Sequence, residues 1–105
     1  MGYSLCAMKV NVELCVEPVG VGVSLSPYIA ECERVLEQAG LKTSLHAHGT
    51  NIEGAWDDVM AAVKACHEAV HKMGAPRVHT TMRIGTRTDR DQTMEERVGS
   101  VLQKK

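Results

Sequence analysis

The sequence contains no phenylalanine, one tryptophan, two tyrosines and three prolines among its 105 residues. A core without phenylalanine must be built from Val, Leu, Ala, Met, Ile and Cys, and six methionines can fill the irregular gaps that these residues leave. No apolar run approaches the length of a membrane span, and the first residues lack the basic region that opens a signal peptide. These absences predict a cytoplasmic chain without a membrane partner.

The charges and the cysteines exclude further classes. A formal net charge of −1 gives no electrostatic attraction to nucleic acid or to a membrane surface. None of the cysteines forms a C-x-x-C pair, and three lie on apolar faces, which favours free thiols in a reducing compartment over a disulfide framework; they are Cys6, Cys15, Cys32 and Cys66. No serine triad motif, P-loop or cysteine nucleophile motif is present, so the local motifs predict a protein that is not an enzyme.

Hydrophobic periodicity predicts the order of the strands and helices. Alternation of period two predicts strands and a 3.6-residue period predicts helices. Ser26 is expected to cap the first helix, with Pro27 at its first position and Gly40 at its end. The expected segments are a strand over 6–17, a helix over 26–39, strands over 42–48 and 50–53, a helix over 55–73, a strand over 77–87, and a closing helix capped by Thr93 with Glu96.

This order predicts a single domain over residues 1–105 with a ferredoxin-like β-α-β-β-α-β fold of the α+β class and an added C-terminal helix. Two helices would cover one face of a four-stranded antiparallel sheet. The other face would then be solvated or used for oligomerisation; it is predicted to carry Lys9, Asn11, His46, His79, Thr81 and Arg83. The glycines Gly20 and Gly22 lack the third glycine of a dinucleotide fingerprint, so we interpret them as part of a loop.

The segment from Gly49 to Gly74 concentrates polar groups next to the longest predicted helix. Glycines at 49 and 54 permit a close backbone approach to a ligand. Between these glycines lie the hydroxyl of Thr50, the amide of Asn51 and the carboxylate of Glu53, and after them come the indole of Trp56 and the carboxylate of Asp57. Such groups suit a small polar aromatic ligand. The alternative is a plain hairpin arm followed by a helix whose acidic first turn complements the helix dipole.

His67-Glu68-Ala69-Val70-His71 matches the H-E-x-x-H pattern of zinc metalloproteases, which places both imidazoles on one helical face. A catalytic zinc needs a third protein ligand, and no downstream motif supplies one. The apolar stripe of this helix also directs the two histidines to its flank, toward solvent, and the short chain leaves little room for a substrate groove. A zinc-dependent hydrolase is therefore a remote alternative.

Two other groups of residues could bind ions. His46 and His48 lie on one strand face, where together with His79 they could bind metal or respond to pH, or lie buried against a partner subunit. Arginines gather late in the chain and could form an anion site or a solvated face; they are Arg77, Arg83, Arg87 and Arg90.

Three blocks of sequence resemble the thiamine-binding protein family, the YkoF-like superfamily of small ferredoxin-like proteins. They are LKTSLHAHGTNIEGAWDDVM, RVHTTMRIGTRTD and TMEERVGSVL. The G-T-x-I-E-G turn, the W-D-x-V helix entry and the strand ending in T-R-T-D are its recurrent features, and the likeness extends over roughly residues 5 to 103. The chain looks most similar to fungal or other eukaryotic members.

This resemblance implies a ferredoxin-like fold, homodimers or homotetramers formed through sheet faces and edges, and binding of thiamine, its pyrimidine moiety or its phosphates without catalysis or a separate cofactor. Thr50, Asn51 and Glu53 could pair with an aminopyrimidine, and Asp57 and the Trp56 ring could attract a cation. Thr81 and Arg83 could complete a pocket between subunits. Asn51 departs from the usual apolar or β-branched residue of the family. The alternative is a structural or regulatory oligomer that binds another anion, sulfate or phosphate.

Overall fold

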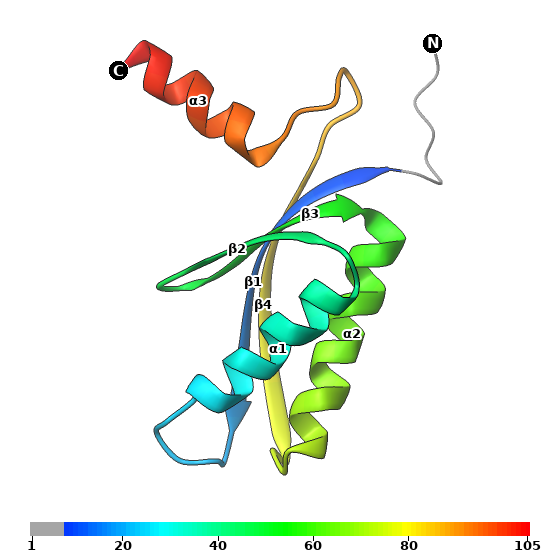
Figure 1. Cartoon of the computed structure of the whole chain (residues 1–105), viewed down its shortest axis with the longest axis vertical. Helices are drawn as coiled ribbons and strands as arrows, with labels where there is room; N and C mark the ends of the chain where they lie inside the picture. The colour runs from blue at the N-terminus through cyan, green and yellow to red at the C-terminus, as the bar shows by residue number, and fades with distance from the viewer. Residues whose placement is uncertain (1–7) are drawn as a thin grey trace.

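The computed structural model describes residues 8–105 (Figure 1). The start of the strand predicted over 6–17, including Cys6, lies outside the described residues. The elements in chain order are β1 (Lys9–Val19), α1 (Ser26–Gln38), β2 (Lys42–His46), β3 (Gly49–Ala55), α2 (Trp56–Lys72), β4 (Arg77–Thr86) and α3 (Met94–Lys104). None of the helices within this part of the chain combines the length and apolar character needed to cross a bilayer.

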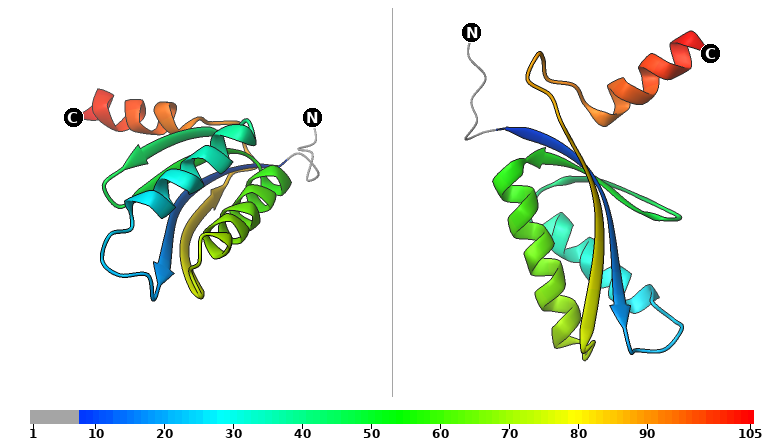
Figure 2. Two further views of the ribbon diagram at one scale, coloured as in Figure 1. Left: turned by 60° about the horizontal axis from the view of Figure 1, so that its bottom comes forward. Right: turned by 180° about the vertical axis from the view of Figure 1, so that it is seen from behind.

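The four strands form one antiparallel sheet in the order β2-β3-β1-β4. Helices α1 and α2 lie side by side on one face of it, and α3 stands apart from them beyond the end of the sheet (Figures 1 and 2). This arrangement confirms the predicted ferredoxin-like α+β fold with a C-terminal helix. We call the sheet face that α1 and α2 leave uncovered the open face.

The register of β1 assigns every strand residue to one of the two faces. Val12 pairs with Ile52 of β3 and with Ile84 of β4, on the helix-covered side. Glu13 pairs with Asn51 and Arg83 on the open face, so the predicted division of the strands into two faces is confirmed. The buried core lies between sheet and helices and consists of Val10, Val12, Leu14, Val16, Cys32, Leu36, Ile52, Val59, Ala62, Val63, Cys66, Val70 and Ala75.

Two expected details of the helices are wrong. The N-cap of α1 is Leu25, whose carbonyl accepts the N–H groups of Tyr28 and Ile29, so Ser26 is already a helical residue. Proline is tolerated throughout the first turn because its missing N–H is not needed there. The helix predicted over 55–73 runs from Trp56 to Lys72, so Met73 is its C-cap and not a helical residue, and its side chain is 40% exposed.

The capping box of α3 is confirmed. The Thr93 hydroxyl accepts the Glu96 N–H at 3.1 Å, and the Glu96 carboxylate accepts the Thr93 N–H at 3.5 Å. These bonds satisfy N–H groups that would otherwise lack partners at the helix start.

Gly49, at the start of β3, is the glycine whose replacement should cost most stability. A Cβ at this position would lie 2.6 Å from the backbone oxygen of Leu14 in β1, so the strands would have to separate. We expect Gly49→Ala to lower the free energy of unfolding by about 1–3 kcal/mol, as for other overpacked sites. Urea unfolding followed by circular dichroism measures this. Gly99→Ala is the matched control, because no atom lies within 4 Å of the added Cβ and alanine favours a helix. Equal stability of the two variants would contradict the expectation.

Candidate functional site

A cavity of about 420 Å³ lies between α1 and the β2–β3 hairpin, on the helix-covered side of the sheet. The amphipathic pattern of α1 and the alternation of β1 turn apolar side chains into it from two directions. Its apolar wall consists of Leu14, Val16, Leu25, Ile29, Cys32, Leu36 and Leu45. We call this the α1 cavity.

Glu33 and Thr50 bring a polar pair to the wall of the α1 cavity. Thr50 is only 5% exposed, and its hydroxyl donates to the Glu33 carboxylate at 3.0 Å. A carboxylate beside an apolar wall favours a ligand that brings hydrogen-bond donors or positive charge, because an unpaired charge loses hydration there. The α1 cavity can therefore hold a flat apolar ring that carries a donor.

The thiols of Cys32 and Cys66 lie behind this wall at the contact between α1 and α2. Both side chains are buried, and Cys66 Sγ donates to the Cys32 carbonyl oxygen at 3.7 Å. Hydrogen bonding to Cys32 and burial raise the pKa of the Cys66 thiol. Cys15 lies on the other side of the sheet, and burial together with the nearby Glu17 raises its pKa. Cys15, Cys32 and Cys66 are all free, which agrees with the prediction for these three cysteines.

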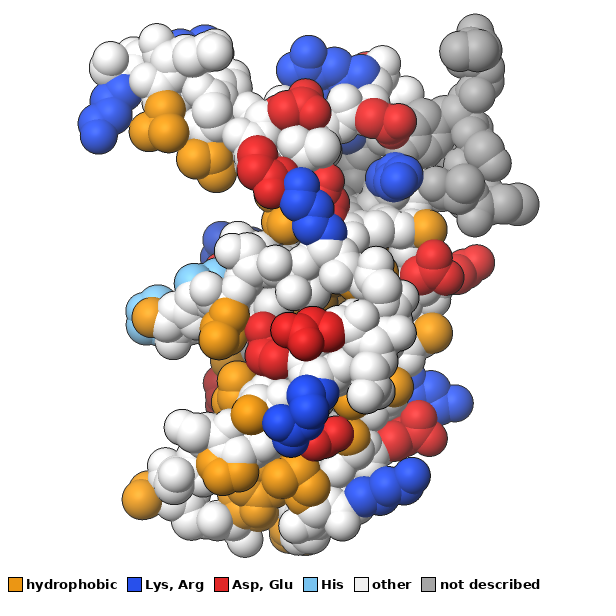
Figure 3. Space-filling view, viewed as in Figure 1, with side chains coloured by type: hydrophobic (Ala, Val, Ile, Leu, Met, Phe, Trp, Pro, Cys, Tyr) orange, Lys and Arg blue, Asp and Glu red, His pale blue; other side chains and the backbone are white. Residues whose placement is uncertain are grey.

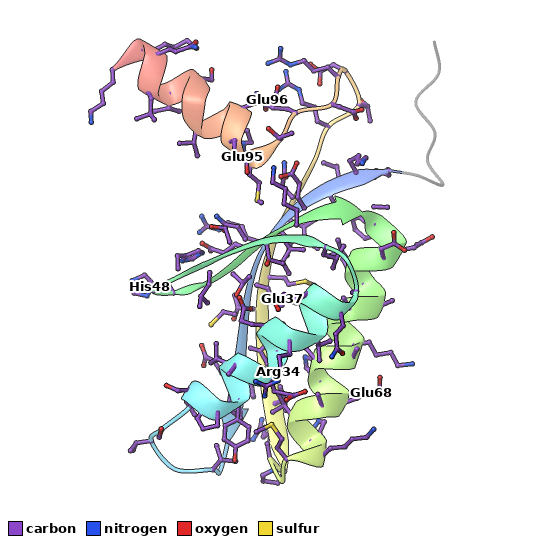
Figure 4. All side chains as sticks on the ribbon, in the orientation of Figure 1. Arg34, Glu37, His48, Glu68, Glu95 and Glu96 are labelled. Atoms are coloured by element: carbon purple, nitrogen blue, oxygen red, sulfur yellow. The ribbon has the colours of Figure 1, made fainter. Side chains whose placement is uncertain are left out.

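The open face carries a hydrogen-bonded group next to the turn of the β2–β3 hairpin. His46 Nε2 lies 3.2 Å from Asn51 Oδ1 and 3.4 Å from Glu13 Oε2. His46 Nδ1 accepts the His48 N–H at 3.3 Å, so Nε2 carries the hydrogen in the neutral ring. His48 itself lies at the tip of the hairpin (Figure 4) and is exposed.

A groove of about 590 Å³ separates the open face from α3. Its floor carries Asn11, Glu13, Asn51 and Arg83, and its roof is the apolar side of α3. Asn11 Oδ1 is buried and has no hydrogen-bond partner among the described residues. We call this the α3 groove.

Glu53 holds the first turn of α3. Its carboxylate accepts the Met94 N–H at 3.2 Å, and Lys42 on the neighbouring strand donates to Glu95 at 2.7 Å. Glu95 and Glu96 mark this turn above the sheet in Figure 4. Glu53 also lines a smaller cavity of about 270 Å³. Its other charged residues are basic at Lys9, Lys42, Arg87 and Arg90 and acidic at Asp91 and Glu96.

The seven residues expected to contact a ligand do not converge on one place. Thr50 lines the α1 cavity, whereas Asn51 and Arg83 line the α3 groove. Glu53 bonds to α3, and Thr81 is exposed on the open face. Trp56 and Asp57 open α2, where Trp56 is 38% exposed and donates its backbone N–H to Met8; neither lines these three cavities.

Sequence reasoning missed Glu33. It stands next to Cys32 on the apolar side of α1, and it faces Thr50 across 17 residues of sequence. The available signal was an acidic residue beside an apolar helical stripe, followed by a threonine on the inward face of the next hairpin.

The histidines of the H-E-x-x-H pattern each have a protein partner. His67 bonds to the Thr80 hydroxyl on β4, and His71 Nδ1 donates to the Ala75 carbonyl at 2.8 Å. His67 is thus partly buried against the sheet and not turned to solvent as expected. Glu68 lies on the side of α2 away from α1 (Figure 4). No group of three residues able to hold a metal ion occurs in residues 8–105.

The late arginines are partly paired. Arg87 donates to Asp89 at 2.5 and 2.8 Å and to Gln92 at 2.9 Å. The Arg87 guanidinium lowers the pKa of the Asp89 carboxyl to about 2. Arg83 instead lines the α3 groove opposite Glu13.

The strand order, the two covering helices and the apolar cavity beneath α1 define a small ferredoxin-like α+β domain. Residues 12–102 match the family model described as Thiamine-binding protein. The chain belongs to this family, as its motifs predicted.

Individual relatives agree with this assignment. A UPF0045 protein of Synechocystis is 66% identical over 95 residues, which cover 90% of this chain and 78% of the relative. A UPF0045 protein of the fungus Eremothecium gossypii is 42% identical over 95 residues, 90% of each chain. The crystal structure of a hypothetical protein from Methanocaldococcus jannaschii superposes with a TM-score of 0.84 at 31% identity, covering 90% of this chain and 96% of that one. The prediction that the chain is most similar to fungal or other eukaryotic members is wrong, because the cyanobacterial relative has a higher sequence identity than the fungal one.

The positions of the thiols predict their reactivity. In a Cys6→Ser variant, we expect Cys15 to react with a disulfide reagent in the native state, and Cys32 and Cys66 to react only after denaturation, because they are buried. The pKa of Cys15 is raised, so less of it is thiolate at pH 8 than for free cysteine; its reaction should be slower than that of glutathione and should accelerate as the pH rises. Adding Cys15→Ser should abolish native labelling. Rapid native labelling of Cys32 would contradict this assignment.

Proposed function

We propose that this chain is a cytoplasmic, non-enzymatic protein that binds a thiamine-class molecule in the α1 cavity. The class comprises thiamine, its phosphates and the free hydroxymethylpyrimidine. The observation that carries the proposal is the Glu33–Thr50 pair, which places a carboxylate and a buried hydroxyl at the wall of an apolar cavity. The free thiols support a reducing location, and membership of the thiamine-binding protein family supports the ligand class.

The chemistry of the ligand matches that of the cavity. An aminopyrimidine is a flat ring with an exocyclic amine that donates and ring nitrogens that accept, so it can donate to Glu33 while its faces contact Ile29 and Leu45. The thiazolium carries a positive charge, which the Glu33 carboxylate at the cavity wall would attract. The volume of about 420 Å³ lies within the range of small-molecule sites.

A second placement uses the residues first expected from the sequence. Asn51 and Arg83 line the α3 groove, with Glu53 at the first turn of α3 and Thr81 further along the open face. A ligand there would be enclosed between subunits. Trp56 and Asp57 contribute to neither placement, since both lie at the start of α2 outside the two cavities.

Calorimetric titration distinguishes the two placements. We expect Glu33→Gln to weaken binding of thiamine or hydroxymethylpyrimidine by about tenfold or more, because a hydrogen bond to a charged group contributes about 1.5–3 kcal/mol. Glu37→Gln is the matched control, since it makes the same charge change on the exposed side of α1. Glu53→Gln should leave the affinity for these ligands within about twofold of the wild-type value.

The remaining outcomes are equally informative. Loss of binding in Glu53→Gln but not in Glu33→Gln would move the site to the open face. Heat from phosphate or sulfate alone, with none from the pyrimidine compounds, would favour an anion-binding oligomer and overturn the thiamine proposal.

We also propose that the protein assembles through its open face into dimers or tetramers. On this face Glu13 and Glu17 form an acidic row on β1, next to Arg77 and Arg83 on β4. A two-fold axis along the strands would place the acidic row of one copy over the basic row of another, which makes the face complementary to itself.

Light scattering after gel filtration tests the assembly. We expect at least twice the molar mass of one chain, and a lower mass for Arg83→Glu, which places like charges opposite Glu13 of the partner. Lys64→Glu, an equal charge change on the exposed side of α2, should keep the wild-type mass. A monomeric wild-type protein would contradict the proposal.

A further inference from the structure

We propose that Cys32 and Cys66 form a redox-sensitive pair, which a small peroxide oxidises to a disulfide that joins α1 to α2. The oxidant is hydrogen peroxide or another peroxide small enough to enter the α1 cavity. Both sulfur atoms belong to one chain, so neither a ligand nor a second copy takes part. Among the free cysteines of residues 8–105, these two belong to the same buried core, whereas Cys15 does not.

The packing of α1 on α2 brings the two thiols into contact. Cys32 and Leu36 are the buried residues of α1, and Cys66 lies in the buried stripe of α2. Cys66 Sγ donates to the carbonyl oxygen of Cys32 at 3.7 Å, so the Cys66 thiol lies against the backbone that carries the Cys32 side chain. A disulfide requires backbones that are already close together. The native packing of the two helices meets this requirement.

The two thiols differ in acidity as a nucleophile and its partner should. A hydrogen bond from the Cys66 thiol lowers the pKa of Cys32, against the opposing effects of burial and of the Glu33 and Glu31 carboxylates. Hydrogen bonding to Cys32 and burial raise the pKa of the Cys66 thiol. Peroxides oxidise the thiolate and not the thiol. Cys32 is therefore the sulfur that reacts first, and Cys66 is the sulfur that then bonds to it.

The α1 cavity gives a peroxide a route to Cys32 but not to Cys66. Cys32 belongs to the cavity wall and is 3% exposed, whereas Cys66 is 0% exposed and lines none of the three cavities. Figure 3 shows charged side chains over the solvent side of α1, where Figure 4 labels Arg34 and Glu37. A disulfide reagent is larger than a peroxide and needs more room behind the attacked sulfur. A peroxide can therefore oxidise a thiol that such a reagent does not label in the folded protein.

The oxidation consists of two balanced steps. The Cys32 thiolate attacks one oxygen of hydrogen peroxide, the O–O bond breaks, and the released hydroxide takes up the proton that the thiol had lost. This step gives Cys32 sulfenic acid and water. The Cys66 sulfur then attacks the Cys32 sulfur, the S–O bond breaks, and the hydroxyl leaves as water with the Cys66 proton. Together the two thiols lose two electrons and two protons, and the peroxide is reduced to two molecules of water.

The disulfide has two consequences for the fold. It would link residues that are 34 positions apart in the sequence, and such a cross-link restricts the unfolded chain more than the folded one. The oxidised protein should therefore require more urea to unfold. Because Cys32 is part of the cavity wall, the bond would also change the surface of the α1 cavity.

Peroxide treatment of the Cys6→Ser, Cys15→Ser protein, followed by intact mass measurement and peptide mapping, tests the pair. We expect the loss of two hydrogen atoms, a cross-linked Cys32–Cys66 peptide, and a higher midpoint of urea unfolding than in the reduced protein. Adding Cys66→Ala removes the second sulfur, so Cys32 should gain oxygen instead. Adding Cys32→Ala should leave Cys66 reduced, because no cavity leads to it. Circular dichroism checks that both alanine variants fold.

The dependence of the oxidation rate on urea separates reaction of the folded protein from reaction after unfolding. We expect a constant rate at urea concentrations well below the unfolding midpoint, because the folded protein itself reacts. A rate that rises exponentially from the lowest urea concentrations would show that only the unfolded chain reacts, and would overturn the proposal. Thiols that stay reduced in the folded protein, or oxygen added to Cys32 while Cys66 is present, would overturn it as well.

Discussion

The alternation of β1 is the constraint on which the rest of the structure depends. β1 is paired on both edges, so its buried residues Val10, Val12, Leu14 and Val16 set the position of β3 and β4 as well as the surface on which the helices pack. A shift of one residue would exchange every side chain between the two faces. The α1 cavity and the α3 groove lie on opposite sides of the sheet because β1 separates them.

The fold was accessible from the sequence because periodicity is a local property. Strand alternation, the helical stripes, Gly40 and the Thr93–Glu96 capping box each involve residues within a few positions of one another. The errors lie at helix boundaries, where the first and last residues depend on backbone hydrogen bonds that the side-chain pattern does not specify. Leu25 replaced Ser26 as the N-cap, and Met73 fell outside α2.

The site was less accessible, for two different reasons. Thr50 and Asn51 are consecutive in a strand and so must point to opposite faces; strand alternation alone therefore excludes a single pocket that contains both. The hydrogen-bond partners of Thr50 and Glu53 could not be predicted from strand alternation. Glu33 and Met94 are 17 and 41 residues away from them, and no local pattern specifies how a helix is placed on a sheet.

Strand β3 links the two surfaces proposed for ligand binding and assembly. Thr50 turns toward Glu33 in the α1 cavity, the adjacent Asn51 bonds to His46 on the open face, and Glu53 holds α3. Backbone pairing with β1 fixes the positions of these residues relative to one another. Gly49 permits this close pairing, since any side chain there would meet the Leu14 carbonyl. Gly49 thus stabilises the pairing of β3 with β1, and the α1 cavity and the open face both depend on this pairing.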